Sequence, residues 1–201
     1  MVETALQWLA AAVRAEPVVD TPTLVERMAL PGGRAVLLRP IQADDAAGEQ
    51  AFVSNLSLAS RQKRFHVGLR QLSPSTLRQM TEVDQLDHVA LVAEVLTEDH
   101  RHEPPPARLV ADARYVRLPD RPGQPGEAEF AIAVADEWQS LGLGRALMAR
   151  LARHAKARGL HALIGDVLPE NRRMLVLMRG LGAETRPHPD GPALVQVVFA
   201  L

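Results

Sequence analysis

One stretch of the chain, residues 127–158, constrains the fold more than any other. It begins with a short apolar run from Ala128 to Val134, whose partial alternation predicts a strand. After a polar turn, apolar side chains recur at helical spacing and leave most of the Arg, His and Lys side chains on the other face. The apolar positions are Leu147, Met148, Leu151, Ala152 and Ala155. The stretch therefore predicts a strand, a glycine-containing turn and an amphipathic helix.

The turn between the predicted strand and helix contains two glycines, Gly142 and Gly144. Glycine lets a bulky group come close to the backbone, and the first N–H groups of a helix have no partner inside it. These donors and the positive end of the helix dipole favour an anion such as a diphosphate, to which Arg145 would add a charge-assisted contact. The alternative interpretation is that the glycines only shape a tight turn.

Residues 139–146, Gln-Ser-Leu-Gly-Leu-Gly-Arg-Ala, resemble the Gln/Arg-x-x-Gly-x-Gly/Ala acyl-CoA signature of the Gcn5-related N-acetyltransferases, the GNAT family. The segment lacks the Gly-Lys-Ser/Thr of a nucleotide P-loop and the third glycine of the Rossmann fingerprint. Residues 166–174 and Leu181-Gly182 resemble the family's next strand and its asparagine-led helix. Residues 57–65 resemble a segment of the acetyltransferase domain in bacterial protein lysine acetyltransferases of the Pat type. Together these motifs extend the resemblance over about residues 33–201.

Composition excludes several classes of partner and chemistry. A chain of 201 residues with 47% hydrophobic content can bury one full core. Its net charge of -1 gives no reason to expect nucleic acid or an anionic membrane as a partner. The absence of cysteine excludes disulfides, thiolate metal sites and a cysteine nucleophile, and it fits a reducing cytoplasm, where we expect the protein. No apolar run approaches the roughly 20 residues that span a bilayer, and the N-terminus lacks the basic region of a signal peptide.

The order of predicted elements indicates a mixed α/β sheet flanked by helices. We expect an N-terminal helical extension over residues 1–32 and an acetyltransferase domain over residues 33–201. The extension would pack on the domain or on a second subunit of a homodimer, and the alternative is a frayed end. The resemblance implies a GNAT-like fold, with a mostly antiparallel central sheet and one splayed pair of parallel strands. Strands are predicted at residues 34–40, 88–96, 108–118, 128–134 and 161–167, with a closing hairpin at 186–201.

Two carboxylates are candidates for the general base. An amine with a pKa near 10.4 is unprotonated in only about one molecule in 2,500 at pH 7, equivalent to roughly 4.6 kcal/mol, so a proton acceptor is needed. Glu127 and Glu129 alternate along the predicted strand and share one face of it. The resemblance implies that Glu129 is the base, with Glu127 as the second candidate. The alternative is that these glutamates only keep an edge strand soluble.

The resemblance also implies which residues bind acetyl-CoA. In the family, the pantetheine arm lies where the two parallel strands splay, and the diphosphate lies on the glycine turn. The matching positions here are Ile132, Ala133, Val134, Gln139, Leu141, Gly142, Leu143, Gly144, Arg145, Ala146 and Asn171. We expect no metal, because the histidines at 100 and 102 lie in a proline-rich segment that predicts a solvent loop rather than a ligand set.

One family feature is missing. Many members have a tyrosine seven residues after the asparagine, where it can protonate the leaving thiolate, and this chain has Met178 there. Its single tyrosine, Tyr115, lies on a predicted strand. We therefore expect water, or no dedicated acid, to protonate CoA, whose thiol has a pKa near 8.5.

The motifs together imply a function. The resemblance implies an N-acetyltransferase that moves acetyl from acetyl-CoA to a primary amine by direct attack, and the Pat-type pattern favours a protein lysine. The alternatives are an acetyltransferase for a small-molecule amine and a non-catalytic acyl-CoA-binding sensor module. The cations Arg61, Lys63 and Arg64 are predicted to form a solvated helix face, with an acidic partner or a phosphate as the alternative.

Overall fold

The computed structural model describes residues 24–96, 108–120 and 126–201, whose eight strands form one sheet. The strands follow the order β1-β2-β3-β4-β5-β6-β8-β7. Neighbouring strands are antiparallel except β5 and β6, which are parallel. This arrangement confirms the expected mixed sheet. The strands are β1 Glu26–Leu30, β2 Arg34–Pro40, β3 His88–Val95, β4 Leu109–Arg117, β5 Glu127–Val134, β6 Ala162–Val167, β7 Glu184–Pro187 and β8 Val195–Ala200.

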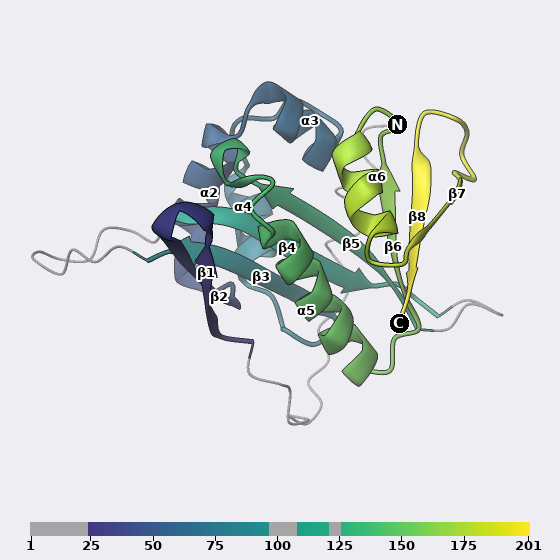
Figure 1. Ribbon diagram of the computed structural model, residues 1–201, viewed down its shortest axis with the longest axis horizontal. Helices are drawn as coiled ribbons and strands as arrows, with labels where there is room; N and C mark the ends of the chain where they lie inside the picture. The colour runs from purple at the N-terminus through teal and green to yellow at the C-terminus, as the bar shows by residue number, and fades with distance from the viewer. Residues whose placement is uncertain (1–23, 97–107, 121–125) are drawn as a thin grey trace, which may run out of the picture.

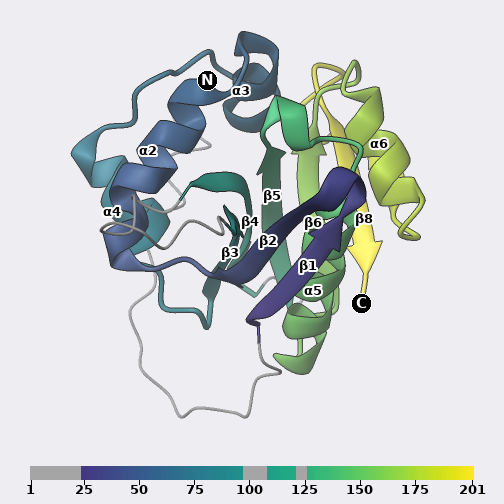
Figure 2. The ribbon, with the colours of Figure 1, turned by 60° about the vertical axis from the view of Figure 1, so that its left-hand side comes forward.

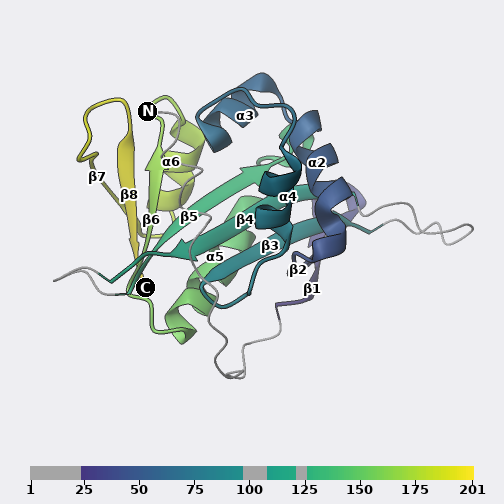
Figure 3. The ribbon, with the colours of Figure 1, turned by 180° about the vertical axis from the view of Figure 1, so that it is seen from behind.

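Helices cover both faces of the sheet. Figure 1 shows α5 and α6 in front of it, whereas the view from behind in Figure 3 shows α2 and α4 on the opposite face. Figure 2 shows α3 beside the end of β5 at which that strand finishes. None of the helices in the described ranges is long and apolar enough to cross a membrane. The helices are α2 Ala46–Asn55, α3 Leu58–Phe65, α4 Pro74–Thr81, α5 Leu143–Ala157 and α6 Arg172–Arg179.

Apolar residues fill both layers between sheet and helices. On the α5 face, the predicted stripe of Leu147, Met148 and Leu151 is fully buried against sheet residues such as Phe130. On the other face, side chains of α2 and α4 pack with residues of β3 in a second cluster. The 3.6-residue spacing of α5 therefore has the structural role that the sequence predicts.

The sheet divides between β5 and β6. The two strands are paired only from Glu127 to Glu129 on β5 and from Ala162 to Ile164 on β6. Beyond that point β5 continues along β4, and β6 continues along β8, so the parallel strands diverge. The ring of Phe130 lies directly over Gly165, where an added Cβ would be only 2.6 Å from ring carbons. A glycine is therefore required for the close approach of the two strands just beyond their last pair.

The N-terminal boundary differs from the expectation. Residues 26–30, which were assigned to a helical extension, form β1 and pair with β2 from Glu26↔Leu38 to Leu30↔Arg34. This strand belongs to the same sheet as the expected domain. The expected first helix and the proline-rich loop with its histidines lie outside the described residues. Elsewhere the predicted strands are confirmed, and so is the amphipathic helix after the glycine turn, which is α5.

Candidate active site

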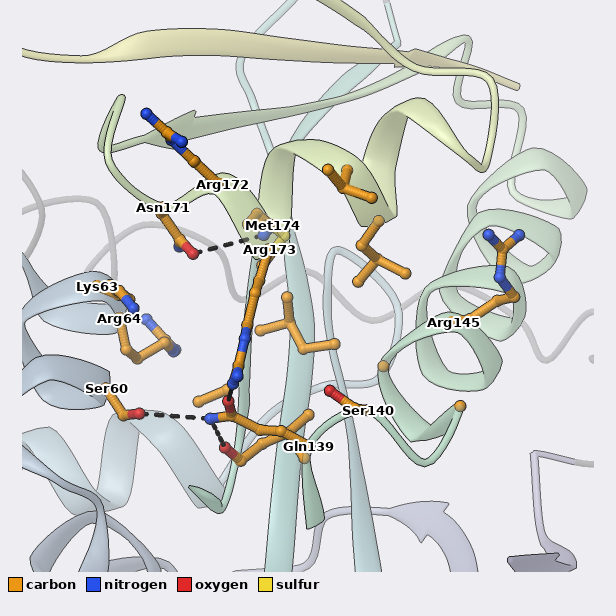
Figure 4. A pocket seen from close by; sticks show the side chains of 17 residues that line it. Ser60, Lys63, Arg64, Gln139, Ser140, Arg145, Asn171, Arg172, Arg173 and Met174 are labelled. Carbon is orange, nitrogen blue, oxygen red and sulfur yellow. Dashed lines mark hydrogen bonds between the residues drawn. The ribbon is translucent and has the colours of Figure 1, made fainter. Parts of the chain in front are cut away.

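A cavity of about 540 Å³ opens where β5 and β6 diverge. Its walls come from the end of β5, the glycine turn, the first turn of α5, α6 and α3 (Figure 4). Segments far apart in the sequence therefore meet around one space. The lining residues are Ser60, Lys63, Arg64, Ile132, Ala133, Val134, Gln139, Ser140, Gly142, Gly144, Arg145, Asn171, Arg172, Arg173, Met174, Val176 and Leu177.

The glycine turn presents free backbone donors to this cavity. Gly142 caps α5 in the left-handed conformation, with φ of 89°, which favours glycine. The first backbone hydrogen bond of the helix runs from Ala146 N to Gly142 O at 3.0 Å, so the N–H groups of residues 143–145 have no partner inside the helix. A Cβ added at Gly142 would meet no atom within 4 Å, which means that the space before the turn is open. These features match an anion site at a helix N-terminus.

A chain of polar side chains crosses the cavity wall at the end of β5 (Figure 4). Gln139 donates from Nε2 to the carbonyl oxygen of Val134 at 3.0 Å, and Arg173 donates from Nη1 to Gln139 Oε1 at 2.6 Å. Gln139 Nε2 also donates a hydrogen bond to Ser60 Oγ at 3.4 Å. The side chain of Gln139 therefore connects the end of β5 with both α3 and α6.

Asp136 fixes α3 to the loop that leads into the turn. Its carboxylate accepts hydrogen bonds from Ser57 N at 2.9 Å, and from Ser57 Oγ and Ser60 Oγ at 2.8 Å each. Partial burial opposes ionisation, but these donors outweigh it and hold the pKa of Asp136 below its ordinary value. Because Ser57 is also the cap of α3, one carboxylate sets the position of that helix against the loop that leads into the glycine turn.

Glu129 lies at the last residue pair before the strands diverge, opposite Ile164. Its side chain keeps an exposed surface, yet surrounding protein removes enough water from the carboxylate to raise its pKa. The carboxylate of Asp166 raises that pKa further, and the charge of Arg64 opposes the rise. Glu127 lies two residues farther from the divergence, opposite Ala162. Neither glutamate is among the residues that line the cavity, and Glu129 is the nearer of the two along β5 to the lining residue Ile132.

Met178, which stands where many family members have a tyrosine, and Tyr115, the single tyrosine of the chain, are both buried away from the cavity. Tyr115 and Met178 have no exposed surface, and neither lines the cavity. The hydroxyl of Tyr115 is hydrogen-bonded to His154 Nδ1 at 2.8 Å, and burial raises the pKa of this tyrosine. Tyr115 is the only tyrosine of the chain, so no tyrosine borders the described cavity.

Most of the cofactor positions implied by the sequence come together here. Ile132, Ala133, Val134, Gln139, Gly142, Gly144, Arg145 and Asn171 line the cavity. Arg145 is turned toward α6, where its Nη1 donates to Gly180 O at 3.0 Å. Leu141, Leu143 and Ala146 differ, because their side chains pack in the core. Leu143 has an N–H without a partner in the helix, whereas the N–H of Ala146 is already used within it.

Sequence reasoning missed the basic residues around the cavity. Arg172 and Arg173 follow the asparagine of the quoted motif directly, and that adjacency was the available signal. Lys63 and Arg64 were assigned to a solvated helix face, yet both line the cavity. No group of three or more His, Cys, Asp or Glu side chains with metal-site geometry occurs within the described ranges.

Comparison with known proteins agrees with this geometry. Residues 78–183 match the model of the family described as "Acetyltransferase (GNAT) family". The chain belongs to the GNAT family. A relative in this family, Acetyltransferase PA5475 of Pseudomonas aeruginosa, is 33% identical over 80% of this chain and 81% of its own. Acetyltransferase Pat of Mycolicibacterium smegmatis is 30% identical over 75% of this chain but 42% of its own, so this GNAT chain spans less than half of that protein. These findings identify the protein as a GNAT-type acetyltransferase.

Solved structures show the same fold. The GNAT domain of S. lividans PAT superposes with a TM-score of 0.76 at 26% identity, over 89% of this chain and 97% of that domain. The GNAT domain described here is therefore close to those of Pat-type acetyltransferases. The yncA protein of Salmonella typhimurium, solved with its cofactor acetyl-CoA, has a TM-score of 0.60 at 17% identity, over 83% of this chain and 92% of its own. At this identity, the similarity between the two proteins shows a shared fold alone.

Proposed function

We propose that this GNAT protein moves the acetyl group of acetyl-CoA to a primary amine by direct attack. The observation that supports this most strongly is the divergence of β5 and β6, which opens a cavity directly onto the free N–H groups of α5. The turn suits a diphosphate. The backbone of residues 132–134, which β6 no longer pairs, suits the amide groups of the pantetheine arm. Acetyl-CoA supplies the activated thioester.

The transfer is a single displacement with a tetrahedral intermediate. The amine nitrogen forms a bond to the thioester carbon, and the carbon–sulfur bond breaks with its electron pair on sulfur. A carboxylate of the protein first takes one proton from the bound ammonium, so that a neutral amine attacks. After the new bond has formed, the nitrogen releases a second proton to solvent, and water protonates the CoA thiolate. The buried positions of Tyr115 and Met178 support water in that last role.

Glu129 is our candidate for the general base. Along the strand it lies roughly 10 Å from Ile132, the first of the three residues whose backbone suits the pantetheine arm, whereas Glu127 lies roughly 16 Å away. Removal of water, together with the neighbouring charge of Asp166, makes Glu129 a stronger base than an ordinary glutamate. These two features favour Glu129 over Glu127.

The acceptor class is the part of the proposal that depends most on similarity to other proteins. Similarity to Pat-type GNAT domains favours a lysine side chain of a protein. A small-molecule amine is the alternative, because fold does not determine the acceptor.

The test has two stages. The first is calorimetric titration with acetyl-CoA, CoA and ATP, for which we expect micromolar binding of the two CoA compounds and none of ATP. The second measures thiol release with lysine peptides and small amines. Thiol release on one acceptor class would support the transfer and choose between protein and metabolite, whereas failure to bind acetyl-CoA would remove the proposal.

The base assignment has its own matched pair of variants. We expect Glu129→Gln to lower kcat by about 100-fold or more, in line with the usual contribution of general base catalysis, and to leave acetyl-CoA affinity unchanged. Glu127→Gln removes the same charge from the same strand face and should retain activity. Equal activity of Glu129→Gln and wild type across the pH range would exclude Glu129 as the base.

A further inference from the structure

Arg64 is the cation whose surroundings differ most from a solvated helix face. It lies on α3, lines the cavity, and has only 13% of its side chain exposed. The adjacent Lys63 is exposed, as expected for a surface cation. The sequence-based prediction of a solvated face is therefore wrong for Arg64.

The nearest counter-ion of Arg64 is already engaged by another arginine. Asp112 on β4 accepts one hydrogen bond from Arg114 Nε at 3.0 Å and a second, shorter one from Arg114 Nη2. Arg64 comes no closer than 3.7 Å to Asp112 Oδ1, which is an ion pair without a hydrogen bond. Its side chain donates no hydrogen bond to any residue of the described ranges. The donors of a nearly buried guanidinium thus border the cavity without a fixed partner.

The carboxyl group of Glu49 does not neutralise this charge. Glu49 is fully buried, and neither of its carboxyl oxygens has a hydrogen-bond partner. Burial, and then the charge of Asp112, raise the pKa of Glu49 to about 8, so it is mostly protonated at neutral pH. Two guanidinium groups, Arg64 and Arg114, therefore face a single nearby carboxylate, that of Asp112. One positive charge is left at the cavity wall.

The opposite charge lies close by. Asp166 and Arg64 are the charged groups that act on Glu129, so two carboxylates and one guanidinium act together beside the last pair of β5 and β6. An amine that enters as a cation is attracted by these carboxylates, of which Asp166 also lies 3.1 Å from His188 Nε2. A negative group on the same molecule would be attracted by Arg64. This arrangement suits an acceptor that carries both charges.

Arg64 is also at the wrong end of the cavity for the diphosphate. Figure 4 shows Lys63 and Arg64 on one side of the cavity and Arg145, on the first turn of α5, on the other, with Gln139 and Arg173 between them. The free N–H groups that suit the diphosphate belong to the α5 end. The thioester end of acetyl-CoA carries no charge, so a negative group that meets Arg64 beside the thioester would belong to the acceptor.

We propose that Arg64 binds a carboxylate that the acceptor carries near its reacting amine. The carboxylate comes either from a free amino acid or from an acidic residue beside a lysine in a protein. In both cases the planar guanidinium offers two parallel donors to the two oxygens. This inference rests on the proposed function, whose acceptor class it makes more specific.

The experiment compares acceptors that differ only in this charge. One arm uses unbranched ω-amino acids of increasing length against their neutral amides. The other arm uses short lysine peptides with a flanking Glu against the same peptides with Gln. Rates of thiol release are expressed per free amine. We expect wild type to prefer the carboxylate form in kcat/KM by about 10- to 100-fold in at least one arm, as a charge-assisted hydrogen bond would give. The arm in which the preference occurs identifies whether the carboxylate belongs to a free amino acid or to an acidic residue beside a lysine.

Variants of Arg64 then test whether this residue causes the preference for acceptors that carry a carboxylate. Arg64→Gln should bring the ratio between the carboxylate and neutral acceptors close to one while leaving the affinity for acetyl-CoA unchanged, which also shows that the variant is folded. Arg64→Lys, which keeps the charge without the planar fork, should retain part of the preference. Arg70→Gln removes an equal charge from an exposed site that does not line the cavity, and it should behave as wild type.

The outcomes separate this inference from the proposed function. If wild type releases thiol equally with both members of every pair, the Arg64 inference is wrong and the transferase proposal stands. An equal loss on both acceptors in Arg64→Gln, with a shifted pH profile, would instead assign Arg64 to the ionisation of Glu129. If no amine gives thiol release, the transferase proposal itself fails.

Discussion

Tyr115 and His154 form a hydrogen bond of 2.8 Å between hydroxyl and Nδ1, which joins β4 to α5 in the interior of the protein. Both side chains are buried. Burial, and then the charge of Arg158, lower the pKa of His154, so the pair is a neutral buried bond. The single tyrosine of the chain therefore serves packing between sheet and helix.

Tyr115→Phe should affect stability rather than turnover. The substitution leaves His154 buried without its partner, which typically costs about 1–3 kcal/mol. We expect that loss in the free energy of unfolding, measured with urea, and an unchanged kcat per folded molecule. A large fall in kcat with unchanged unfolding would show that Tyr115 takes part in protonating the thiolate.

His88 should make the protein sensitive to mild acid. Burial, and then the charge of Arg114, lower the pKa of His88 to about 4. Arg114 Nη1 lies 3.3 Å from His88 Nε2, and because arginine can only donate, that nitrogen must be the acceptor of a neutral ring. The unfolded chain takes up a proton near pH 6.5. The stability from neutral His88 is therefore complete above about pH 6.5 and is lost as the pH falls toward 4.

Urea unfolding between pH 7.5 and 4.5 measures this effect. We expect wild type to lose up to about 1.4 kcal/mol per pH unit more than His88→Gln in this interval. His161→Gln, which changes an exposed histidine, is the matched control and should follow wild type. Parallel curves for wild type and His88→Gln would contradict the prediction.

Glu49 should have the opposite pH dependence. Its pKa is about 8 in the folded protein and near 4.3 in the unfolded chain, so unfolding releases a proton between these values. The stability that protonated Glu49 contributes is present below about pH 4.3 and is lost as the pH rises to 8. Glu49→Gln removes this dependence. The stability of the variant relative to wild type should therefore rise by up to about 1.4 kcal/mol per pH unit from pH 5 to 8, and a constant difference would show that Glu49 stays ionised.

Gly165→Ala should strain the contact beside the divergence of β5 and β6. The new Cβ would lie 2.6 Å from the ring of Phe130, and overpacking of this kind costs about 1–3 kcal/mol. We expect Phe130→Leu to restore part of that loss in the double variant, which urea unfolding of all four proteins would show as a coupling energy. Strictly additive effects would mean that the ring is free to move away.

Local patterns predicted the parts of the structure that local interactions determine. The apolar stripe of α5 follows from the spacing of its residues, and it is confirmed. Strand β1 was missed because its sequence, Glu-Arg-Met-Ala-Leu, consists of good helix formers, and only pairing with β2 makes it a strand. Tertiary contact overrides intrinsic preference at this position.

The same reasoning explains what was predicted of the site. The glycine turn and Asn171 lie in contiguous motifs, so their place at the cavity was visible in the sequence. Arg64 and Glu49 lie on helices whose charged residues resemble ordinary surface positions. Arg64 is paired with Asp112, and the charges of Asp112 and Arg114 act on Glu49, but both of these residues come from a strand much later in the chain. A single sequence does not contain that contact.

The short pairing of β5 with β6 divides the sheet into two parts. The same boundary divides the sequence, because all strands of one part precede all strands of the other along the chain. Strands β1 to β5 form one arm, and β6, β8 and β7 form the other, built entirely from residues 162–201. During synthesis, the first arm and α5 emerge from the ribosome before any strand of the second arm does. The cavity gains its α6 wall only when that later segment folds back. A nascent chain can thus assemble most of its core before it has a place to hold a substrate.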